Sequence, residues 1–396
     1  MRRPHSQNIL NQSTDAEPQL SVQSRLDDWV RHAPTEEEQA VRVKVASQFQ
    51  NAGVRIDENG RIHVEKSIDL SRYSGLTALP AHLRVDGDFN LSGCTGLTTL
   101  PDNLIVSGDL YLYSCRGLIV LPNDLSVGGT LDFFNCKSLT ALPNNLIVGG
   151  DLKLFGCVGL TSFPDNLSVG QRLNLSRCTS LMALPENLTV GEDLDLSGCT
   201  GLMALPNNLI VGKDLDLSGC TGLTTLPDDL IVGGSLNLSH CTGLTALPDN
   251  LIVARSLYLY NCRSLMVFPE HLSVLGALNL SSCTGLTVLP DNLIVGGSLY
   301  LSNCTGLTAL PQNLRVNGNL NLSNCSGLTA LPDDLIVSGD LDLTGCRGLT
   351  ALPNWFATLG RNENDGDIRQ VDLTGTGLSE TILNRLSDLN NPHVQF

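Results

Sequence analysis

The chain has 396 residues, with 24 Lys or Arg against 40 Asp or Glu, and a formal net charge of -16 at pH 7. This balance disfavours a protein that reads nucleic acid through a phosphate footprint, so we expect no nucleic-acid partner. Hydrophobic residues reach 42%, enough for a sizeable core. No apolar run approaches the roughly eighteen residues of a membrane span, which excludes an integral membrane helix.

The first predicted elements are a polar tail and a helical cap. Residues 1–20 are rich in Ser, Gln and Asn, and we expect them to be disordered. Within residues 21–66, Leu26 and Trp29 lie at helical spacing before Pro34. Thr35-Glu36-Glu37-Glu38 then matches a capping box that opens a second helix, with Val41, Val45 and Phe49 on one face. We expect this helical hairpin to cover the first coil of a repeat domain, with Trp29 as a packing anchor.

Residues 67–353 consist of repeats with a period of 21 residues, which thirteen evenly spaced Cys mark from Cys94 to Cys346. One unit reads L-x-L-x-x-C-x-x-L-x-x-L-P-x-x-L-x-V. Its alternation predicts a short strand with leucines inward, followed by an extended return in which Pro needs no hydrogen-bond donor. The pattern predicts a leucine-rich-repeat solenoid of about fifteen coils, an α/β fold with one long parallel sheet on its concave face and an extended convex side.

The cysteines could serve metal binding, disulfides or nucleophilic catalysis, or they could be structural. Neighbouring coils place them within disulfide reach, but their side chains run parallel, and their number is odd. We interpret them as buried thiols that donate weakly to turn carbonyls, in a reducing compartment.

The C-terminal cap is predicted over residues 354–396. It begins where Trp355 and Phe356 interrupt the repeat, and it includes a polar insertion at 360–367 and one last strand. A final helix is expected after Ser379, a plausible N-cap, with Ile382, Leu383, Leu386 and Leu389 on one face.

The two ends resemble a known family. Trp29-x-x-x-Ala33-Pro34-x-x-x-Glu38-x-x-x-Arg42 resembles the helical start of bacterial type III secreted leucine-rich-repeat effectors. These comprise the invasion-plasmid-antigen-type ubiquitin ligases and the Yersinia outer-protein M type. The segment 377–383 is similar to the one that closes their repeat domain. The resemblance implies that residues 1–20 are a secretion-type N-terminus and that the protein reaches the host cytoplasm without a cleavable Sec signal.

In the ligase branch of this family, a helical domain with a nucleophilic Cys follows the repeats. No Cys follows Cys346 here, so the resemblance implies no catalytic residue in this chain. The seven His are scattered without metal-ligand spacing and are interpreted as solvated surface residues. We therefore expect no catalytic site, no metal and no cofactor.

The strongest local signal is aromatic. The outward position after L-x-L carries Ser in most repeats, but three consecutive repeats carry Tyr113, Phe134 and Phe155, with Tyr111 and Lys153 on neighbouring outward sites. A second group consists of Tyr258, Tyr260 and Tyr300. Phe133 differs, because it replaces an inward leucine, and we expect it in the core. Exposed aromatic clusters of this kind favour a protein-binding site. The alternative is that the rings pack on the cap or on one another.

Carboxylates form a further candidate surface. Asp193 and Asp195, and then Asp214 and Asp216, put four acids on two adjacent strands. Repetition makes these groups equivalent on an open sheet, so we interpret them as a solvated acidic surface rather than a calcium or catalytic site. A cationic protein surface would complement them.

The pattern as a whole predicts a non-enzymatic protein-interaction module, a secreted virulence effector that binds a host protein with a basic and apolar surface. Two alternatives stay open. One is the substrate-recognition part of a ubiquitin ligase whose catalytic domain is missing from this chain. The other is a bacterial repeat scaffold unrelated to secretion. The sequence does not indicate an oligomeric state.

Overall fold

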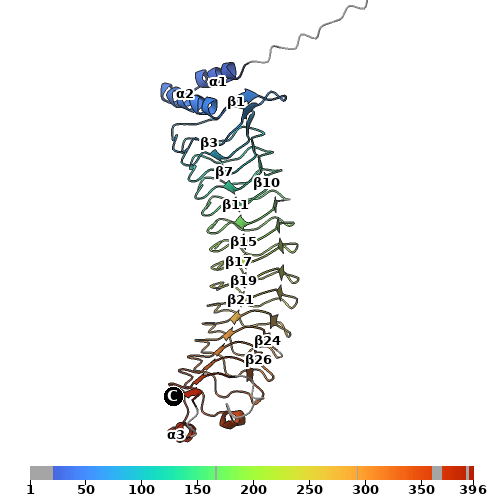
Figure 1. The fold of residues 1–396 in the computed structure, drawn as a ribbon. Helices are drawn as coiled ribbons and strands as arrows, with labels where there is room; N and C mark the ends of the chain where they lie inside the picture. Colours follow the sequence, from blue (N-terminus) through green and yellow to red (C-terminus); the bar gives the residue numbers. More distant parts are fainter. Residues whose placement is uncertain (1–20, 166, 292, 359–367, 389–391) are drawn as a thin grey trace, which may run out of the picture.

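The computed structural model describes residues 21–165, 167–291, 293–358, 368–388 and 392–396. These residues form an elongated solenoid with two helices at one end and the C-terminus at the other (Figure 1). The predicted polar tail at 1–20 and the insertion at 360–367 lie outside the described residues. Within the described ranges, no helix has the length and apolar character needed to cross a membrane.

The long sheet is built from the L-x-L segments, as predicted. Across the described residues it has sixteen strands, and parallel neighbours pair leucine with leucine, as in Leu194 with Leu215. The inward leucines are buried, whereas the residue between them faces solvent in most coils. The strands are β3 (Ile68–Asp69), β5 (Phe89–Asn90), β7 (Leu110–Tyr111), β9 (Leu131–Asp132), β11 (Leu152–Lys153), β13 (Leu173–Asn174), β15 (Leu194–Asp195), β17 (Leu215–Asp216), β19 (Leu236–Asn237), β21 (Leu257–Tyr258), β23 (Leu278–Asn279), β25 (Leu299–Tyr300), β27 (Leu320–Asn321), β29 (Leu341–Asp342), β30 (Val371–Asp372) and β31 (Val394–Gln395).

The extended return of each coil forms a second ladder, which the sequence analysis did not foresee. Within the described ranges, these back sheets have eleven and four strands. Extended segments that stack at the coil spacing bring N–H and C=O groups of neighbouring coils within hydrogen-bond reach, so they pair. The strands are β1 (Val54–Ile56), β2 (Ile62–Val64), β4 (Leu83–Val85), β6 (Ile105–Val106), β8 (Ser126–Val127), β10 (Ile147–Val148), β12 (Ser168–Val169), β14 (Thr189–Val190), β16 (Ile210–Val211), β18 (Ile231–Val232) and β20 (Ile252–Val253), then β22 (Ser273–Val274), β24 (Ile294–Val295), β26 (Arg315–Val316) and β28 (Ile336–Val337).

The core between the sheets is a column of leucines, valines and the thirteen cysteines. Each Cys Sγ donates to the carbonyl oxygen of a residue in the preceding coil, at 2.9–3.2 Å, as Cys220 does to Leu196. The residue before many of these Cys has a positive φ, for example 63° at His240 and 72° at Gly219. The prediction of buried structural thiols is confirmed for this ladder.

The N-terminal cap consists of α1 (Val22–Arg31), α2 (Glu36–Asn51) and an antiparallel pair, β1 and β2. β2 then pairs in parallel with β4, so the cap extends the back sheet as well as covering the core. The ring centroids of Trp29 and Phe49 lie 6.4 Å apart, edge to face, which confirms Trp29 as a packing residue. The Thr35 hydroxyl accepts from the Glu38 N–H, which is one half of the predicted capping box.

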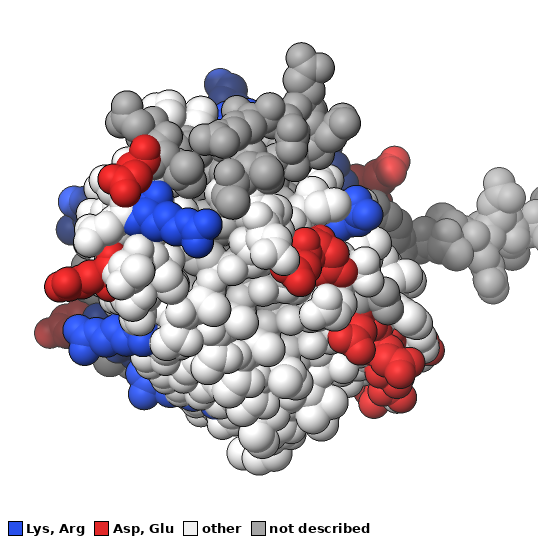
Figure 2. Space-filling model, turned by 90° about the horizontal axis from the view of Figure 1, so that it is seen from below, with Lys and Arg blue, Asp and Glu red and all other residues white. Residues whose placement is uncertain are grey.

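The C-terminal cap contains the 3-10 helix η1 (Asn354–Thr358), β30, α3 (Glu380–Asp388) and β31. The Ser379 hydroxyl accepts from the Ile382 N–H at 3.4 Å, and Ile382, Leu383 and Leu386 lie against the core. Leu389 lies outside the described residues. β31 adds a strand beyond the last coil, which the sequence analysis did not expect. Seen from this end, charged side chains gather on the two flanks of the molecule, and a broad uncharged area between them extends to the lower edge of the view (Figure 2).

Candidate protein-binding surface

The outward face of the long sheet follows one rule. In eleven of the fifteen coils the residue between the two inward positions is Asn or Asp, and its Oδ1 accepts from the backbone N–H two residues on. This Asx turn satisfies the N–H group of the second residue after each of these strands. The remaining four coils carry residues that cannot accept this bond, namely Tyr111, Lys153, Tyr258 and Tyr300. All four belong to the predicted binding surface.

The predicted aromatics of the first group form a continuous aromatic row, defined as Tyr111, Tyr113, Phe134 and Phe155. Their successive ring centroids are 5.7, 6.4 and 4.9 Å apart. Tyr113 is 38% exposed and Phe134 is 46% exposed, whereas Phe133 is fully buried as predicted. The rings therefore pack on one another and also face solvent. Ring packing and an exposed aromatic surface, which were considered as alternatives, are both present at this site.

Carboxylates anchor the tyrosine end of the aromatic row. The Tyr111 hydroxyl donates to Asp109 at 2.7 Å, and this bond raises the pKa of Tyr111 to about 12. Burial, together with the nearby carboxylate of Asp132, raises the pKa of Tyr113. Asp132 is itself only 4% exposed, and burial raises the pKa of its carboxyl group. The hydrogen bond to Asp109 thus fixes the Tyr111 hydroxyl and leaves its ring as the available contact surface.

Cations flank the other end of the aromatic row. The Arg177 guanidinium lies over the Phe155 ring, 5.4 Å from its centroid. The Lys153 Nζ lies 3.7 Å from an oxygen of Asp151, and Lys153 is in register with Asp132 on the next strand. The predicted Lys153 site is therefore part of the same surface, but its charge is partly compensated.

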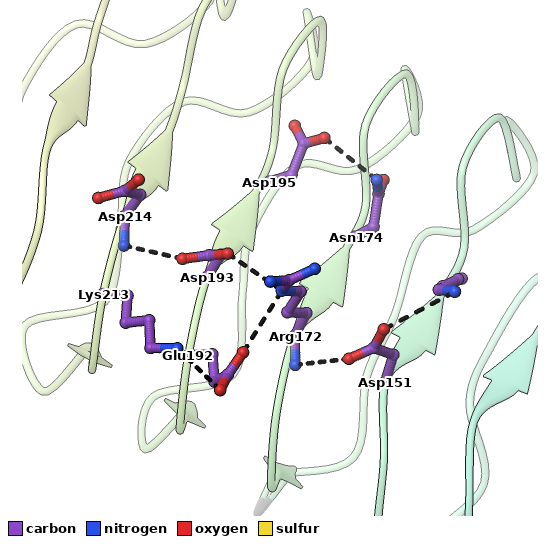
Figure 3. A network of polar contacts seen from close by, with 9 residues as sticks. Asp151, Arg172, Asn174, Glu192, Asp193, Asp195, Lys213 and Asp214 are labelled. Carbon is purple, nitrogen blue, oxygen red and sulfur yellow. Dashed lines mark hydrogen bonds and ion pairs between the residues drawn. The ribbon is translucent and has the colours of Figure 1, made fainter.

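The acidic centre, defined as Asp193, Asp195, Asp214 and Asp216, lies on β15 and β17 and just before them. Figure 3 shows the first three of these residues. Asp195 and Asp216 are in register and each makes an Asx turn. Asp193 and Asp214 each accept from the N–H at the equivalent position of the following coil, at 3.2 and 2.7 Å. One oxygen of every carboxylate is therefore used by the fold.

Basic side chains neutralise part of this acidic centre. The Arg172 Nε lies 3.1 Å from Asp193 and 3.4 Å from Glu192, and the Lys213 Nζ lies 2.8 Å from Glu192 (Figure 3). Among the described residues, no group of three or more His, Cys, Asp or Glu is arranged to hold a metal ion. The geometry favours a solvated acidic surface with a structural role in the turns.

The tyrosine cluster, defined as Tyr258, Tyr260 and Tyr300, lies further along the same face. The three side chains are 37%, 41% and 37% exposed. Tyr258 and Tyr300 are separated by one strand, since each is in register with Asn279. The Tyr260 ring packs edge to face on His240, with 5.1 Å between centroids. The tyrosine cluster is thus separate from the aromatic row, with the acidic centre between them.

Two features of the structure were not predicted from the sequence. His63 was interpreted as solvated, and this is wrong: it is buried, with Nε2 2.6 Å from Asp86, and this hydrogen bond holds the pKa of Asp86 below its ordinary value. The second feature is a row of exposed isoleucines on the back sheet, including Ile210, Ile231 and Ile252. The signal in the sequence was the Ile that recurs directly before the inward Val of many repeats.

Several solved leucine-rich-repeat structures are similar to this chain over most of its length, at low sequence identity. No family model matches the chain, and no curated protein matches it. Among solved structures, a leucine-rich repeat protein from Bacteroides ovatus is 13% identical, covers 82% of this chain and 96% of its own, and has a TM-score of 0.35. YopM, a leucine-rich effector protein from Yersinia pestis, is 17% identical, covers 88% of this chain and 97% of its own, with a TM-score of 0.27.

A third similar structure is the leucine-rich repeat domain of the type III effector XopL. It is 18% identical, covers 89% of this chain and 96% of its own, and has a TM-score of 0.17. The chain has a leucine-rich-repeat fold. That fold is typical of protein-interaction modules.

Proposed function

We propose that this protein is a non-enzymatic binding module whose long sheet holds a partner protein against its outward face. The observation that carries the proposal is the aromatic row. Tyr113, Phe134 and Phe155 replace the Ser that this position carries in most coils, and two of the three rings are more than one-third exposed. Clustered aromatic side chains on a rigid surface are the usual centre of a protein interface.

The partner that fits this face has an apolar segment next to a basic region. The apolar part would cover the aromatic row, while the acidic centre would steer the basic part during association. Arg172 and Lys213 compensate only some of the acidic charge, since Asp195 and Asp216 form no ion pair with a described basic side chain.

The test is capture of partners from a host-cell lysate by the wild type and by the double variant Tyr113→Ala, Phe134→Ala. Each substitution should weaken binding by about 2 kcal/mol, roughly 30-fold, while the melting transition is retained. The matched control is Ile210→Ser, Ile231→Ser on the back sheet, where Ser126 and Ser168 occupy the equivalent position in other coils. Proteins that the wild type and the control retain equally, and that the aromatic variant loses, support the proposal.

Two results would contradict this assignment. If a well-folded aromatic variant retains the same proteins as the wild type, the partner binds elsewhere. If the variant loses its melting transition instead, the aromatic row stabilises the solenoid and has no separate binding role.

We further propose that the protein is a secreted bacterial effector that acts in the host cytoplasm. The support is the resemblance of the cap residues Trp29, Glu38 and Arg42, and of segment 377–383, to type III effectors. Fusing residues 1–60 to a translocation reporter tests this directly. Reporter activity in host cells that depends on the secretion system is expected, and its absence would favour an unrelated repeat scaffold.

A further inference from the structure

The outward position of the long sheet has an alternating pattern over seven consecutive strands, β17 to β29. Register pairs place these residues side by side in one row across the sheet. The row reads Asp216, Asn237, Tyr258, Asn279, Tyr300, Asn321 and Asp342. Asparagine therefore occupies every second strand, tyrosine occupies the two alternate strands in the middle, and aspartate closes the row at both ends.

The two tyrosines are unfavourable for the fold alone. In the neighbouring coils, Asn279 and Asn321 accept the N–H groups of Ser281 and Ser323, at 3.0 and 2.9 Å. A tyrosine at the same position cannot form this Asx turn, and the lost hydrogen bond affects a backbone group in each of these coils. Both rings are 37% exposed. Their presence at alternate strands is therefore better explained by a ligand than by the solenoid.

The spacing of the row identifies the shape of that ligand. Parallel strands lie about 4.8 Å apart, so positions two strands apart are separated by about 9.6 Å. A polyproline II helix rises about 3.1 Å per residue and has three residues per turn, which gives about 9.3 Å per turn. A segment in this conformation along the row would place every third residue over Tyr258 and Tyr300. The mismatch of about 0.3 Å per turn stays below about 1 Å over the whole row.

Asparagine supplies the hydrogen bonds that such a segment needs. The carbonyl groups of a polyproline II helix have no internal partners. The Oδ1 of Asn279 is held by Ser281, which leaves its Nδ2 as the free donor between the two tyrosine rings. Within the described part of the chain, Nδ2 of Asn279 has no acceptor, whereas Nδ2 of Asn237 donates to Asp216 at 3.3 Å.

Charge fixes the ends of the segment. The five strands from β19 to β27 carry no charged residue at three positions on this face. These positions are the residue before the first inward position, the row residue, and the residue after the second inward position. The first acids in the row on either side are Asp216 and Asp342, each two strands beyond a tyrosine. One further turn of a polyproline II helix reaches each of them, so a basic residue three positions outside each ring-contacting proline would meet a carboxylate.

We infer that this row binds a proline-rich segment in the polyproline II conformation, with prolines three residues apart and Arg or Lys three residues beyond each. The inference rests on the proposed function only in that the outward face of the long sheet binds protein. It does not use the aromatic row. Aromatic-lined surfaces with an interposed hydrogen-bond donor suit such segments, because the preformed helix loses little conformational entropy on binding.

The probe is the labelled peptide Arg-Pro-Ala-Pro-Pro-Ala-Pro-Pro-Ala-Arg, with binding to the full chain followed by fluorescence anisotropy. The control peptide, Arg-Pro-Pro-Pro-Ala-Ala-Ala-Pro-Pro-Arg, has the same composition but no two prolines three residues apart. We expect the probe to bind at least tenfold more tightly than the control peptide. Equal affinity, or no binding of either peptide, would overturn the inference.

The protein variants use residues that the row already contains. Tyr258→Asn and Tyr300→Asn restore the Asx turn found in adjacent coils, so each should keep or raise the melting temperature while weakening probe binding at least tenfold. Tyr113→Ala, in the aromatic row, should leave probe binding unchanged. If the Tyr→Asn variants bind the probe like the wild type, or if Tyr113→Ala weakens it equally, the assigned row is wrong.

Two further variants test the ends. Asn occupies the same position at Asn237, so both Asp216→Asn and Asp342→Asn keep the turn. Asp342→Asn removes only the charge, whereas Asp216→Asn also removes the oxygen that accepts from Asn237 Nδ2. Each should lower affinity for the probe severalfold and flatten its salt dependence, with no effect on a peptide whose terminal arginines are alanine. An equal loss for both peptides would contradict the charge contact. If the probe does not bind but partners are still captured through the aromatic row, this inference is wrong and the proposed function remains supported.

Discussion

The cysteine ladder shows how one residue type serves every coil. The Cys241 Sγ is fully buried and donates to the Leu217 carbonyl oxygen at 3.1 Å. Burial raises the pKa of this thiol to about 12. A neutral thiol at this position fills the space beneath the turn and satisfies a carbonyl group without introducing charge. Because the thiolate is the reactive form, these cysteines should be inert towards alkylating reagents in the folded protein near neutral pH.

Alkaline pH should weaken the ladder. An unfolded thiol loses its proton near pH 8.5, whereas the folded Cys241 keeps its proton until the pH approaches its pKa of about 12. The folded state then binds more protons than the unfolded state, so the free energy of unfolding falls as the pH rises through this window. Each buried thiol contributes about 1.4 kcal/mol per pH unit to this loss.

Cys241→Ser isolates this effect, because serine keeps a donor but does not titrate. Near neutral pH the variant should be less stable by about 1 kcal/mol, owing to the more polar hydroxyl group. At about pH 10 the wild type has lost about 2 kcal/mol from this thiol, so the order of stability should reverse. Urea unfolding of both proteins at the two pH values measures this. Parallel pH dependences would show that the Cys241 thiol titrates normally in the folded state.

Single residues also show what could be predicted from the sequence. The two-residue period correctly assigned Phe133 to the core and Phe134 to the surface, because alternation follows directly from strand geometry. The environment of His63 was not predictable, because its partner Asp86 comes from the next coil and His63 lies in the cap, where the repeat has not begun. Asp195 and Asp216 each accept a backbone N–H in an Asx turn. In the sequence, the only sign of this turn was the preference for Asn or Asp between the two inward residues of each strand.

At the scale of elements, the N-terminal cap is held by one buried ion pair. Arg42 donates to Glu38 at 2.7 and 2.9 Å and to the Trp29 carbonyl oxygen at 2.6 Å. The same Glu38 oxygen accepts from the Thr77 hydroxyl in the first coil. Burial alone would raise the pKa of Glu38, but the hydrogen bonds from Thr77 and Arg42 and the guanidinium charge outweigh it and hold the pKa below its ordinary value. The pair therefore connects both cap helices to the solenoid.

Removing one partner should open the cap. Arg42→Met leaves the Glu38 carboxylate buried without its cation, at a cost of about 3 kcal/mol. Hydrogen exchange should accelerate in α1 and α2 and remain slow in the central coils. The double variant Arg42→Met, Glu38→Gln removes the isolated charge and should recover most of this loss. Unchanged protection of α1 and α2 in the single variant would show that the ion pair contributes little.

Acid should act on the same contact. The folded pKa of Glu38 is depressed, so its contribution to stability is present above the unfolded value of about 4.3. This contribution is lost as the pH falls through the lower folded pKa. Protection of α1 and α2 should therefore decline on acidification in the wild type, and this decline should be smaller in the double variant.

The element-level predictions succeeded where a pattern spans many coils. Thirteen Cys at a constant interval predicted thirteen of the fifteen coils and the register of the long sheet between them. The back sheets were not predicted, because almost all of their coil strands contribute only two residues, of which one side chain points inward. β31 was not predicted either, since Val394–Gln395 follows a helix and lies outside the period. A strand this short is determined by the open edge of β30, with which it pairs.

At the scale of the whole molecule, the repeated coil separates stability from recognition. Each coil contacts mainly its neighbours, so stability is close to a sum of equivalent terms along the solenoid. The outward residues differ from coil to coil, which divides one face into the aromatic row, the acidic centre and the alternating row of Tyr and Asn between Asp216 and Asp342. Their order and spacing depend only on how many coils lie between them. Adding or removing a coil should therefore change which ligands bind, even though the solenoid still folds.

Deleting one complete coil tests this separation. Removal of residues 263–283 joins Cys262 to Thr284 and eliminates the coil that carries Asn279. The solenoid should still form, with one coil fewer, because equivalent coils replace the lost contacts. Tyr258 and Tyr300 would then lie on adjacent strands, about 4.8 Å apart, which no longer matches a polyproline II turn of about 9.3 Å.

The matched control removes residues 158–178, one coil between the aromatic row and the acidic centre. Both deletions should preserve a cooperative melting transition and a similar circular dichroism spectrum per residue. The proline-rich probe should bind the control like the wild type and bind the other deletion at least tenfold more weakly. If both deletions bind the probe equally, the distance between Tyr258 and Tyr300 does not determine recognition. If either deletion fails to fold, the coils are less interchangeable than their common register pairs and buried thiols indicate.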